Sequence, residues 1–218
     1  MSKIFMNNVY QRLNNAGIVA VLVLQEEKHI CPTIESLLSG GVSAIELTLR
    51  TPIAIEAVNT ITKKYPEMLC GVGTILTPEQ LALAKKAGAN FGVAPGLNRR
   101  VMDRALEEKF SFAPGIATAS DIETALEYDC KLLKFFHAEK MGGLSYLTSL
   151  NAPYKHLGLT YIPLGGLNET NLATYAKESI IGGIGGSWIA SSKLIADEQW
   201  DRITKNARNA MQILNKER

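Results

Sequence analysis

Apolar positions recur along the chain in a pattern of short runs followed by longer segments with helical spacing. The first run, Ile18–Leu24, is continuously apolar and rich in β-branched residues. This pattern is typical of a strand covered on both faces, as strands of parallel sheets are. Strands are predicted at residues 18–24, 44–49, 69–75, 91–94, 110–113, 132–136, 160–163 and 180–184.

A helix is predicted after each strand, which gives a repeat of about 27 residues. In one of them Thr77 is placed as the N-cap, Pro78 as the first helical residue, and Gly88 as the terminator. The first predicted helix ends at residue 38. The other seven cover residues 52–65, 77–87, 98–108, 120–128, 144–150, 168–177 and 199–214, and residues 1–16 are predicted to form an additional helix before the first strand.

Eight strand–helix units without an intervening linker or charge block predict a single domain over residues 1–218. Eight units favour a closed (β/α)₈ TIM barrel with an additional N-terminal helix. A doubly wound open sheet is the alternative, but it usually has fewer strands and a Gly-x-Gly-x-x-Gly turn after the first strand, where this sequence has none. In a barrel, the active site is expected at the carboxyl ends of the strands.

The composition is typical of a soluble globular chain, with 46% hydrophobic and 20% charged residues, and excludes disorder and collagen. The 23 basic and 21 acidic residues are interspersed, so we expect no nucleic-acid partner. The longest apolar run, residues 17–24, is too short to span a bilayer. The three cysteines, Cys31, Cys70 and Cys130, are too far apart for a metal-ligand spacing and predict a reducing, cytoplasmic location.

The second predicted strand carries charged residues at alternate positions. Glu46, Thr48 and Arg50 lie on the face opposite to Ile45 and Leu47. In a barrel the apolar face must pack on the helices, which sends the polar face inward. Because isolated ionised groups are costly to bury, these positions predict either a functional role or a structural Glu46–Arg50 ion pair.

The sixth predicted strand places a lysine at the centre of an apolar run. Lys134 alternates with Leu133 and Phe135 and is therefore expected to point inward, where desolvation favours the neutral amine over the ammonium. A neutral amine can attack a ketone and form an iminium, which withdraws electrons from the substrate. With Glu46 in the same interior, Lys134 indicates carbonyl chemistry. The alternatives are a side chain that extends outward to solvent or a structural core ion pair.

Glycines cluster after the last two predicted strands, at Gly165-Gly166 and at 182–186, before Ser187. Barrels often bind phosphate in these two loops through bare backbone N–H groups. The clusters therefore predict an anion site to which Ser187 adds a hydroxyl, with tight turns as the alternative.

The histidines do not form a metal-ligand spacing with each other or with a cysteine, so we expect neither a metal nor a cofactor. His29 and His156 are expected at the surface. His137 follows the sixth strand directly and is a further candidate for proton transfer. Because the sequence shows no set of metal-ligating residues, a mechanism through a lysine amine is favoured over one through a metal-stabilised enolate.

Seven segments, taken together and in order, resemble the 2-keto-3-deoxy-6-phosphogluconate (KDPG) and 4-hydroxy-2-oxoglutarate (KHG) aldolase family. The resemblance covers residues from about 16 to 210, and the glutamate-to-arginine strand with the lysine strand is its most specific part. The segments are Ile45–Thr51, Gly71–Ile75, Val93–Gly96, Ala113–Thr118, Leu133–Glu139, Pro163–Gly166 and Gly185–Trp188.

The resemblance implies a role for each matching residue. Lys134 would form a Schiff base with the C2 ketone of the substrate, and Glu46 would be the general acid and base. Implied substrate contacts are Arg50 and Thr74 at the carboxylate end, Pro95 shaping that pocket, and Gly165, Gly166 and Ser187 at the distal phosphate.

The resemblance further implies a class I, metal-independent homotrimeric aldolase that takes a small 2-keto acid. It would cleave KDPG to pyruvate and glyceraldehyde 3-phosphate, KHG to pyruvate and glyoxylate, or both. Leu164, Ala117 and His137 replace the usual threonine, serine and proline of the family, which leaves the preferred substrate open. The alternatives are the related phosphogalactonate (KDPGal) aldolase, a phosphosugar isomerase or epimerase, and a non-catalytic sugar-phosphate-binding barrel.

Overall fold

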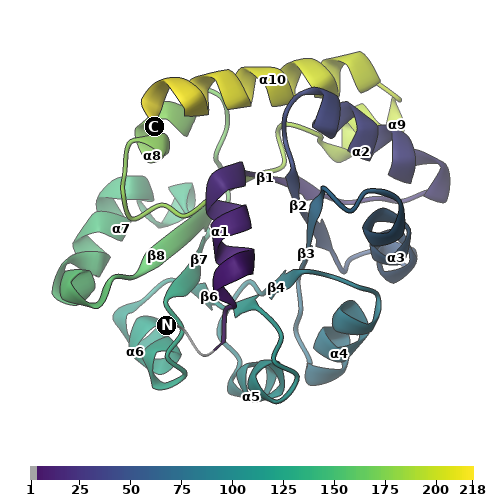
Figure 1. Cartoon of the computed structure of the whole chain (residues 1–218). Helices are drawn as coiled ribbons and strands as arrows, with labels where there is room; N and C mark the ends of the chain where they lie inside the picture. The colour runs from purple at the N-terminus through teal and green to yellow at the C-terminus, as the bar shows by residue number, and fades with distance from the viewer. Residues whose placement is uncertain (1–3) are drawn as a thin grey trace.

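The chain folds as an α/β protein with a curled parallel sheet, described over residues 4–218 by a computed structural model (Figure 1). Every strand pairing in the two sheets is parallel. The strands are β1 Ile18–Leu22, β2 Ala44–Thr48, β3 Leu69–Gly73, β4 Phe91–Val93, β5 Phe112–Ala113, β6 Gly115–Ile116, β7 Leu132–Phe136, β8 Thr160–Leu164 and β9 Ile184–Gly186.

Helices surround the strands, and α1 lies across the middle of the strands in the view of Figure 1. The α-helices are α1 Asn7–Ala16, α2 Ile30–Ser39, α3 Ala54–Lys64, α4 Pro78–Lys86, α5 Arg99–Glu107, α6 Ala119–Glu127, α7 Gly143–Asn151, α8 Leu172–Ala176, α9 Ser192–Ala196 and α10 Trp200–Glu217. Three 3₁₀ helices, Glu27–His29, Glu139–Met141 and Ala152–Leu157, lie in the connections. Within residues 4–218, no helix is both long enough and apolar enough to cross a membrane.

The strands form a six-stranded sheet in the order β5-β4-β3-β2-β1-β9 and a three-stranded sheet in the order β6-β7-β8. Pro114 separates β5 from β6, and because proline has no N–H it cannot donate to the ladder there. Its carbonyl still accepts a hydrogen bond from the Lys134 N–H of β7, at 2.9 Å. A parallel bridge between Tyr161 and Ile181 lies on the other side of the three-stranded sheet.

Alternating side chains on the strands pack into two separate cores. Ile45 and Leu47 of β2 and Leu133 of β7 belong to the larger core, which the strands share with the outer helices. Residues on the opposite strand faces, such as Leu69 and Phe91, form a second cluster with Val9, Leu13 and Ala16 of α1. The predicted division of each strand into two faces is therefore confirmed for β2.

Several predicted elements differ in position. The fifth strand, expected at residues 110–113, is observed as two short strands, β5 Phe112–Ala113 and β6 Gly115–Ile116, separated by Pro114. The eighth strand was expected at residues 180–184, whereas β9 covers Ile184–Gly186, because a turn uses the Ile181 N–H to bind the Glu178 carbonyl at 3.0 Å. The helix expected over residues 1–16 is observed at Asn7–Ala16, and residues 1–3 lie outside the described part of the chain. Thr77 caps α4 as predicted, since its hydroxyl accepts a hydrogen bond from the Gln80 N–H.

Candidate active site

A cavity of about 220 Å³ opens at the carboxyl ends of the strands. It is the place where the strand alternation brings the inward-facing polar side chains of distant βα units together. The eight catalytic and substrate-binding residues implied by the family resemblance all line it: Glu46, Arg50, Thr74, Pro95, Lys134, Gly165, Gly166 and Ser187.

Lys134 and Glu46 form a buried pair inside this cavity. The Lys134 Nζ lies 2.9 Å from Glu46 Oε1 and 3.1 Å from Oε2, and the two side chains are only 5% and 4% exposed. The two residues come from β7 and β2, which are not neighbours in either sheet. Lys134 therefore does not extend outward to solvent, and the partner of Glu46 is Lys134 rather than Arg50.

The space for this pair is made by a small residue on the strand beside β2. Gly73 of β3 faces Glu46, and a Cβ atom at this position would overlap Glu46 Oε1. On the lysine side, the Phe136 ring lies with its centroid 5.1 Å from Nζ. Glycine on one side and an aromatic ring on the other thus confine the amine and the carboxylate to one place.

The pair is suited to proton transfer coupled to nucleophilic attack. A charged pair in a low-dielectric interior is held by its own attraction and hydrogen bonds. Because the carboxylate lies within hydrogen-bond distance of the amine, it can accept the ammonium proton and leave a neutral nucleophile beside a carboxylic acid. The same acid can then return a proton to an oxygen that leaves the substrate.

One end of the cavity carries a guanidinium group. Arg50 is exposed at the mouth, and its Nε donates a hydrogen bond to Thr48 Oγ1 at 3.2 Å. The Thr48 hydroxyl in turn donates to the Leu22 carbonyl at 3.2 Å. These two hydrogen bonds use only the Nε of Arg50 and leave its terminal nitrogens available for a planar anion such as a carboxylate.

Thr74, directly after β3, has a φ of 63°. This left-handed conformation is costly for a β-branched residue and occurs preferentially at functional sites. Pro95 is exposed at the same mouth. The guanidinium, the strained threonine and the proline ring together form one polar end of the cavity.

The opposite end consists of the loops that follow β8 and β9. Gly165 and Gly166 have φ values of 99° and 87°, which few residues other than glycine adopt. The Gly166 carbonyl accepts hydrogen bonds from the side-chain amides of Asn168 and Asn171, at 3.3 and 3.2 Å. Ser187 is exposed beside these loops and also lines the cavity.

Of the three histidines, only His156 lies where the sequence predicted it. His29 is only 3% exposed, because Trp200 and Glu198 cover it, and its Nε2 lies 3.4 Å from Glu198 Oε1. The prediction that His29 lies at the surface is wrong, whereas His156 is exposed. His137 packs against the Phe136 ring, with centroids 3.4 Å apart, and lies outside the residues that line the cavity.

Sequence reasoning missed the aromatic wall of the cavity. Phe136 lies two residues after Lys134 and so shares its strand face, a spacing that could have identified it. Leu164, noted only as a departure from the family pattern, is buried and also lines the cavity. In the part of the chain that the structure describes, no group of three or more histidine, cysteine, aspartate or glutamate side chains could hold a metal ion.

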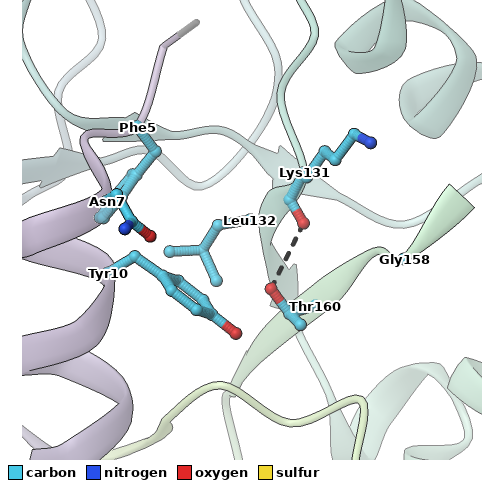
Figure 2. Close-up of a pocket in the computed structure, with 7 residues that line it drawn as sticks. All are labelled: Phe5, Asn7, Tyr10, Lys131, Leu132, Gly158 and Thr160. Carbon is cyan, nitrogen blue, oxygen red and sulfur yellow. Dashed lines mark hydrogen bonds between the residues drawn. The ribbon is translucent and has the colours of Figure 1, made fainter. Parts of the chain in front are cut away.

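A second cavity, of about 240 Å³, lies between α1 and the amino ends of β7 and β8. Figure 2 shows Tyr10 and Leu132 projecting into it, and Thr160 donates a hydrogen bond to the Lys131 carbonyl at 3.4 Å. Its described lining residues include no carboxylate. It lies at the opposite end of β7 from Lys134, so it is separate from the amine–carboxylate site.

The curled parallel sheet and the buried amine–carboxylate pair together define a class of protein, an α/β enzyme that attacks carbonyl substrates through a lysine. Comparison with known families agrees with this class. A model of the KDPG and KHG aldolase family matches residues 9–206, and the chain therefore belongs to the KDPG and KHG aldolase family.

Individual relatives agree in sequence and in fold. The KHG/KDPG aldolase of Escherichia coli K12 is 36% identical over 200 residues, which are 92% of this chain and 93% of the relative. The crystal structure of KDPG aldolase from Legionella pneumophila, with pyruvate captured as a covalent carbinolamine intermediate, aligns with a TM-score of 0.88 at 29% identity, over 93% of this chain and 97% of that one. The crystal structure of the KDPG aldolase of Zymomonas mobilis, solved with 3-phosphoglycerate, aligns with a TM-score of 0.85 at 33% identity, over 94% of this chain and 95% of that one.

Proposed function

We propose that this class I aldolase cleaves KDPG to pyruvate and glyceraldehyde 3-phosphate, and KHG to pyruvate and glyoxylate, through a Schiff base on Lys134. The observation that carries the proposal is the buried contact between Lys134 Nζ and Glu46 inside the cavity. The relatives support it, because they include a KHG/KDPG aldolase and a KDPG aldolase with covalently captured pyruvate.

The reaction begins when Glu46 takes the proton of the Lys134 ammonium. The neutral amine attacks the C2 ketone, and the carbonyl oxygen gains a proton to give a carbinolamine. Loss of that oxygen as water, with a proton from the Glu46 carboxyl group, leaves a cationic imine between C2 and Nζ. The Phe136 ring beside Nζ favours a cation at this position.

Cleavage uses the imine as an electron sink. Glu46, a carboxylate again after the loss of water, takes the proton of the C4 hydroxyl. The aldehyde forms at C4, and the electron pair of the C3–C4 bond moves toward the imine nitrogen to give an enamine. Glu46 then returns a proton to C3 of the enamine, which restores the imine. Addition of water and expulsion of the Lys134 amine then release pyruvate and regenerate the pair with Glu46.

The remaining cavity residues orient the substrate. Arg50 and Thr74 hold the carboxylate and Pro95 shapes this end, so that the amine meets C2 rather than C1. At the other end, Gly165, Gly166 and Ser187 bind the distal phosphate, as loops in these positions do in other barrels. Both assignments rest on the two polar ends of one cavity.

The proposal includes a complete eight-stranded (β/α)₈ barrel, a single domain over residues 1–218, with α1 as an additional N-terminal helix across the amino ends of the strands. Pro114 is the one residue between β5 and β6, and the Tyr161–Ile181 bridge lies beside β8. The Lys134–Glu46 contact joins strands of different sheets across the interior, which supports closure. A homotrimer and a cytoplasmic location remain predictions from the resemblance and from the cysteine content.

Trapping with borohydride tests the mechanism. Incubation with pyruvate and borohydride should leave one reduced pyruvate on Lys134, identified by peptide mass spectrometry. The Lys134→Ala variant should carry none, and Lys131→Ala, which removes the other lysine near β7, should be trapped like the wild type. An unmodified Lys134 in the wild type would reject the Schiff base.

An assay of pyruvate release tests the substrates. It would be run with chelator present on KDPG, on its galactonate epimer and on KHG, because buried Leu164 offers no hydrogen bond to the substrate hydroxyls. Release from the galactonate compound alone would indicate the phosphogalactonate enzyme. Binding of all three without release of pyruvate would indicate a non-catalytic barrel, and full isomerase turnover by Lys134→Ala would indicate an isomerase.

A further inference from the structure

A buried tyrosine on α8 binds a glutamate in the connection that follows the lysine strand. The Tyr175 hydroxyl donates a hydrogen bond to Glu139 Oε1 at 2.5 Å, and Tyr175 is 1% exposed. Burial, and then the hydrogen bond to Glu139, raise the pKa of the Tyr175 hydroxyl. The hydroxyl therefore stays protonated and remains the donor in this contact.

Glu139 is also connected to the glycine loop through its backbone. Its N–H donates to the Gly165 carbonyl at 3.0 Å, and the preceding Ala138 N–H donates to the Leu164 carbonyl at 2.8 Å. These two hydrogen bonds continue the pairing of β7 with β8 beyond the ends of the strands. The connection after Lys134 is thereby fixed to the loop at the far end of the cavity.

The side chain of Glu139 sets the spacing of this contact. A Cβ at Gly166 would lie 2.7 Å from Glu139 Cβ and 2.9 Å from its Cγ, so the glutamate packs directly on the glycine backbone. A Cβ at Gly143 would lie 3.1 Å from Glu139 Oε1. Glu139 is solvent-exposed, and it thus contacts the glycine loop, the start of α7 and Tyr175 of α8.

From these contacts we infer that Glu139, held by Tyr175, is a positioning residue that sets the distance between the Gly165–Gly166 loop and the Lys134 amine. Neither side chain lines the cavity, so both act through the loop. The loop must meet the anionic end of a substrate whose ketone is held at Lys134, and an anion contact is sensitive to displacement. This inference rests on the proposed aldolase function.

The test compares substrates with and without the distal phosphate. KM and kcat for pyruvate release would be measured with KDPG and with 2-keto-3-deoxygluconate, which lacks the distal phosphate. The affinity for inorganic phosphate would be measured by calorimetry. In Tyr175→Phe and Glu139→Ala, KM for KDPG and Kd for phosphate should rise about tenfold, while kcat changes by less than about twofold. Glu139→Gln, which keeps an acceptor for the Tyr175 hydroxyl, should recover part of the loss.

A matched tyrosine–glutamate contact away from the site provides the control. Tyr154 donates to Glu123 Oε1 at 3.0 Å near the surface, so Tyr154→Phe should leave both constants unchanged. Unchanged phosphate affinity in the Tyr175 and Glu139 variants, an equal loss of kcat on both substrates, or a wild type that does not bind phosphate would each overturn the positioning role. Failure of borohydride trapping on wild-type Lys134 would instead reject the aldolase itself, because trapping with pyruvate does not require the phosphate end.

Discussion

At the scale of single residues, burial has opposite effects on the nucleophiles of this chain. Lys134 is buried beside a carboxylate that can take its proton, so in the proposed mechanism its amine is available for attack. Cys70 and Cys130 are buried without such a partner. Desolvation is the largest effect on their thiols, and it raises their pKa values. A buried nucleophile becomes reactive only where a neighbouring group can accept its proton.

The cysteines give a prediction for pH and labelling. Burial raises the pKa of the Cys70 thiol to about 12 and that of Cys130 to about 12, from an ordinary value of 9.0. Folding therefore favours the protonated thiols. Their contribution to stability is complete below about pH 9 and is lost as the pH rises through about 12.

At pH 8, a thiol reagent should label only the half-buried Cys31 in the folded protein and all three cysteines after unfolding in guanidinium. The measurement is the number of labelled thiols per chain, with the labelled peptides identified by mass spectrometry. Rapid labelling of Cys70 or Cys130 in the folded state would contradict the assigned burial.

At the scale of elements, β2, β3 and β7 each contribute one face to the site and one face to the outer core. Alternation of side chains places Glu46 and Lys134 on inner faces while Ile45 and Leu133 pack on the helices. A strand can therefore carry a reactive group without losing its packing. The neighbouring strand must then leave room for that group, which Gly73 of β3 does.

Substitution of Gly73 by alanine tests this requirement. The added methyl would displace the Glu46 carboxylate from the Lys134 amine, and we expect kcat to fall about 10²-fold, since a displacement of this size disrupts the reacting geometry. Gly96→Ala is the matched control, because a Cβ at Gly96 meets no atom within 4 Å. Equal activity of the two variants in the pyruvate-release assay would show that Glu46 does not need its present position.

At the scale of the whole molecule, the Lys134–Glu46 pair joins strands of two different sheets. Burial of both charges has a large desolvation cost, and their attraction offsets it only while both are present. We therefore expect the pair to contribute reactivity rather than stability. Comparison of single and double substitutions can separate these two contributions.

Lys134→Met should lower the free energy of unfolding by about 3 kcal/mol, because it leaves the Glu46 carboxylate buried without a partner. The double variant Lys134→Met/Glu46→Leu should recover this loss and match or exceed the wild type. Urea unfolding followed by circular dichroism, at one fixed protein concentration, measures both effects. A double variant clearly less stable than the wild type would mean that the pair itself stabilises the fold.

The sequence by itself determined the order of strands and helices, the Thr77 cap and the two faces of β2 and β7, and its motifs indicated the family. These properties depend on neighbours a few positions apart, through backbone geometry and the spacing of side chains. The position of β9 was misjudged, because the competing turn at Glu178 and Ile181 depends on a single backbone hydrogen bond.

Only the tertiary structure decided which inward groups meet. Lys134 pairs with Glu46, 88 positions away, rather than Glu46 with nearby Arg50. His29 is buried because Trp200 packs on it from a distant helix, and Tyr175 reaches Glu139 from another. Such contacts depend on how the strands curl and how helices pack on them, and these are sums over many weak interactions that no local segment specifies.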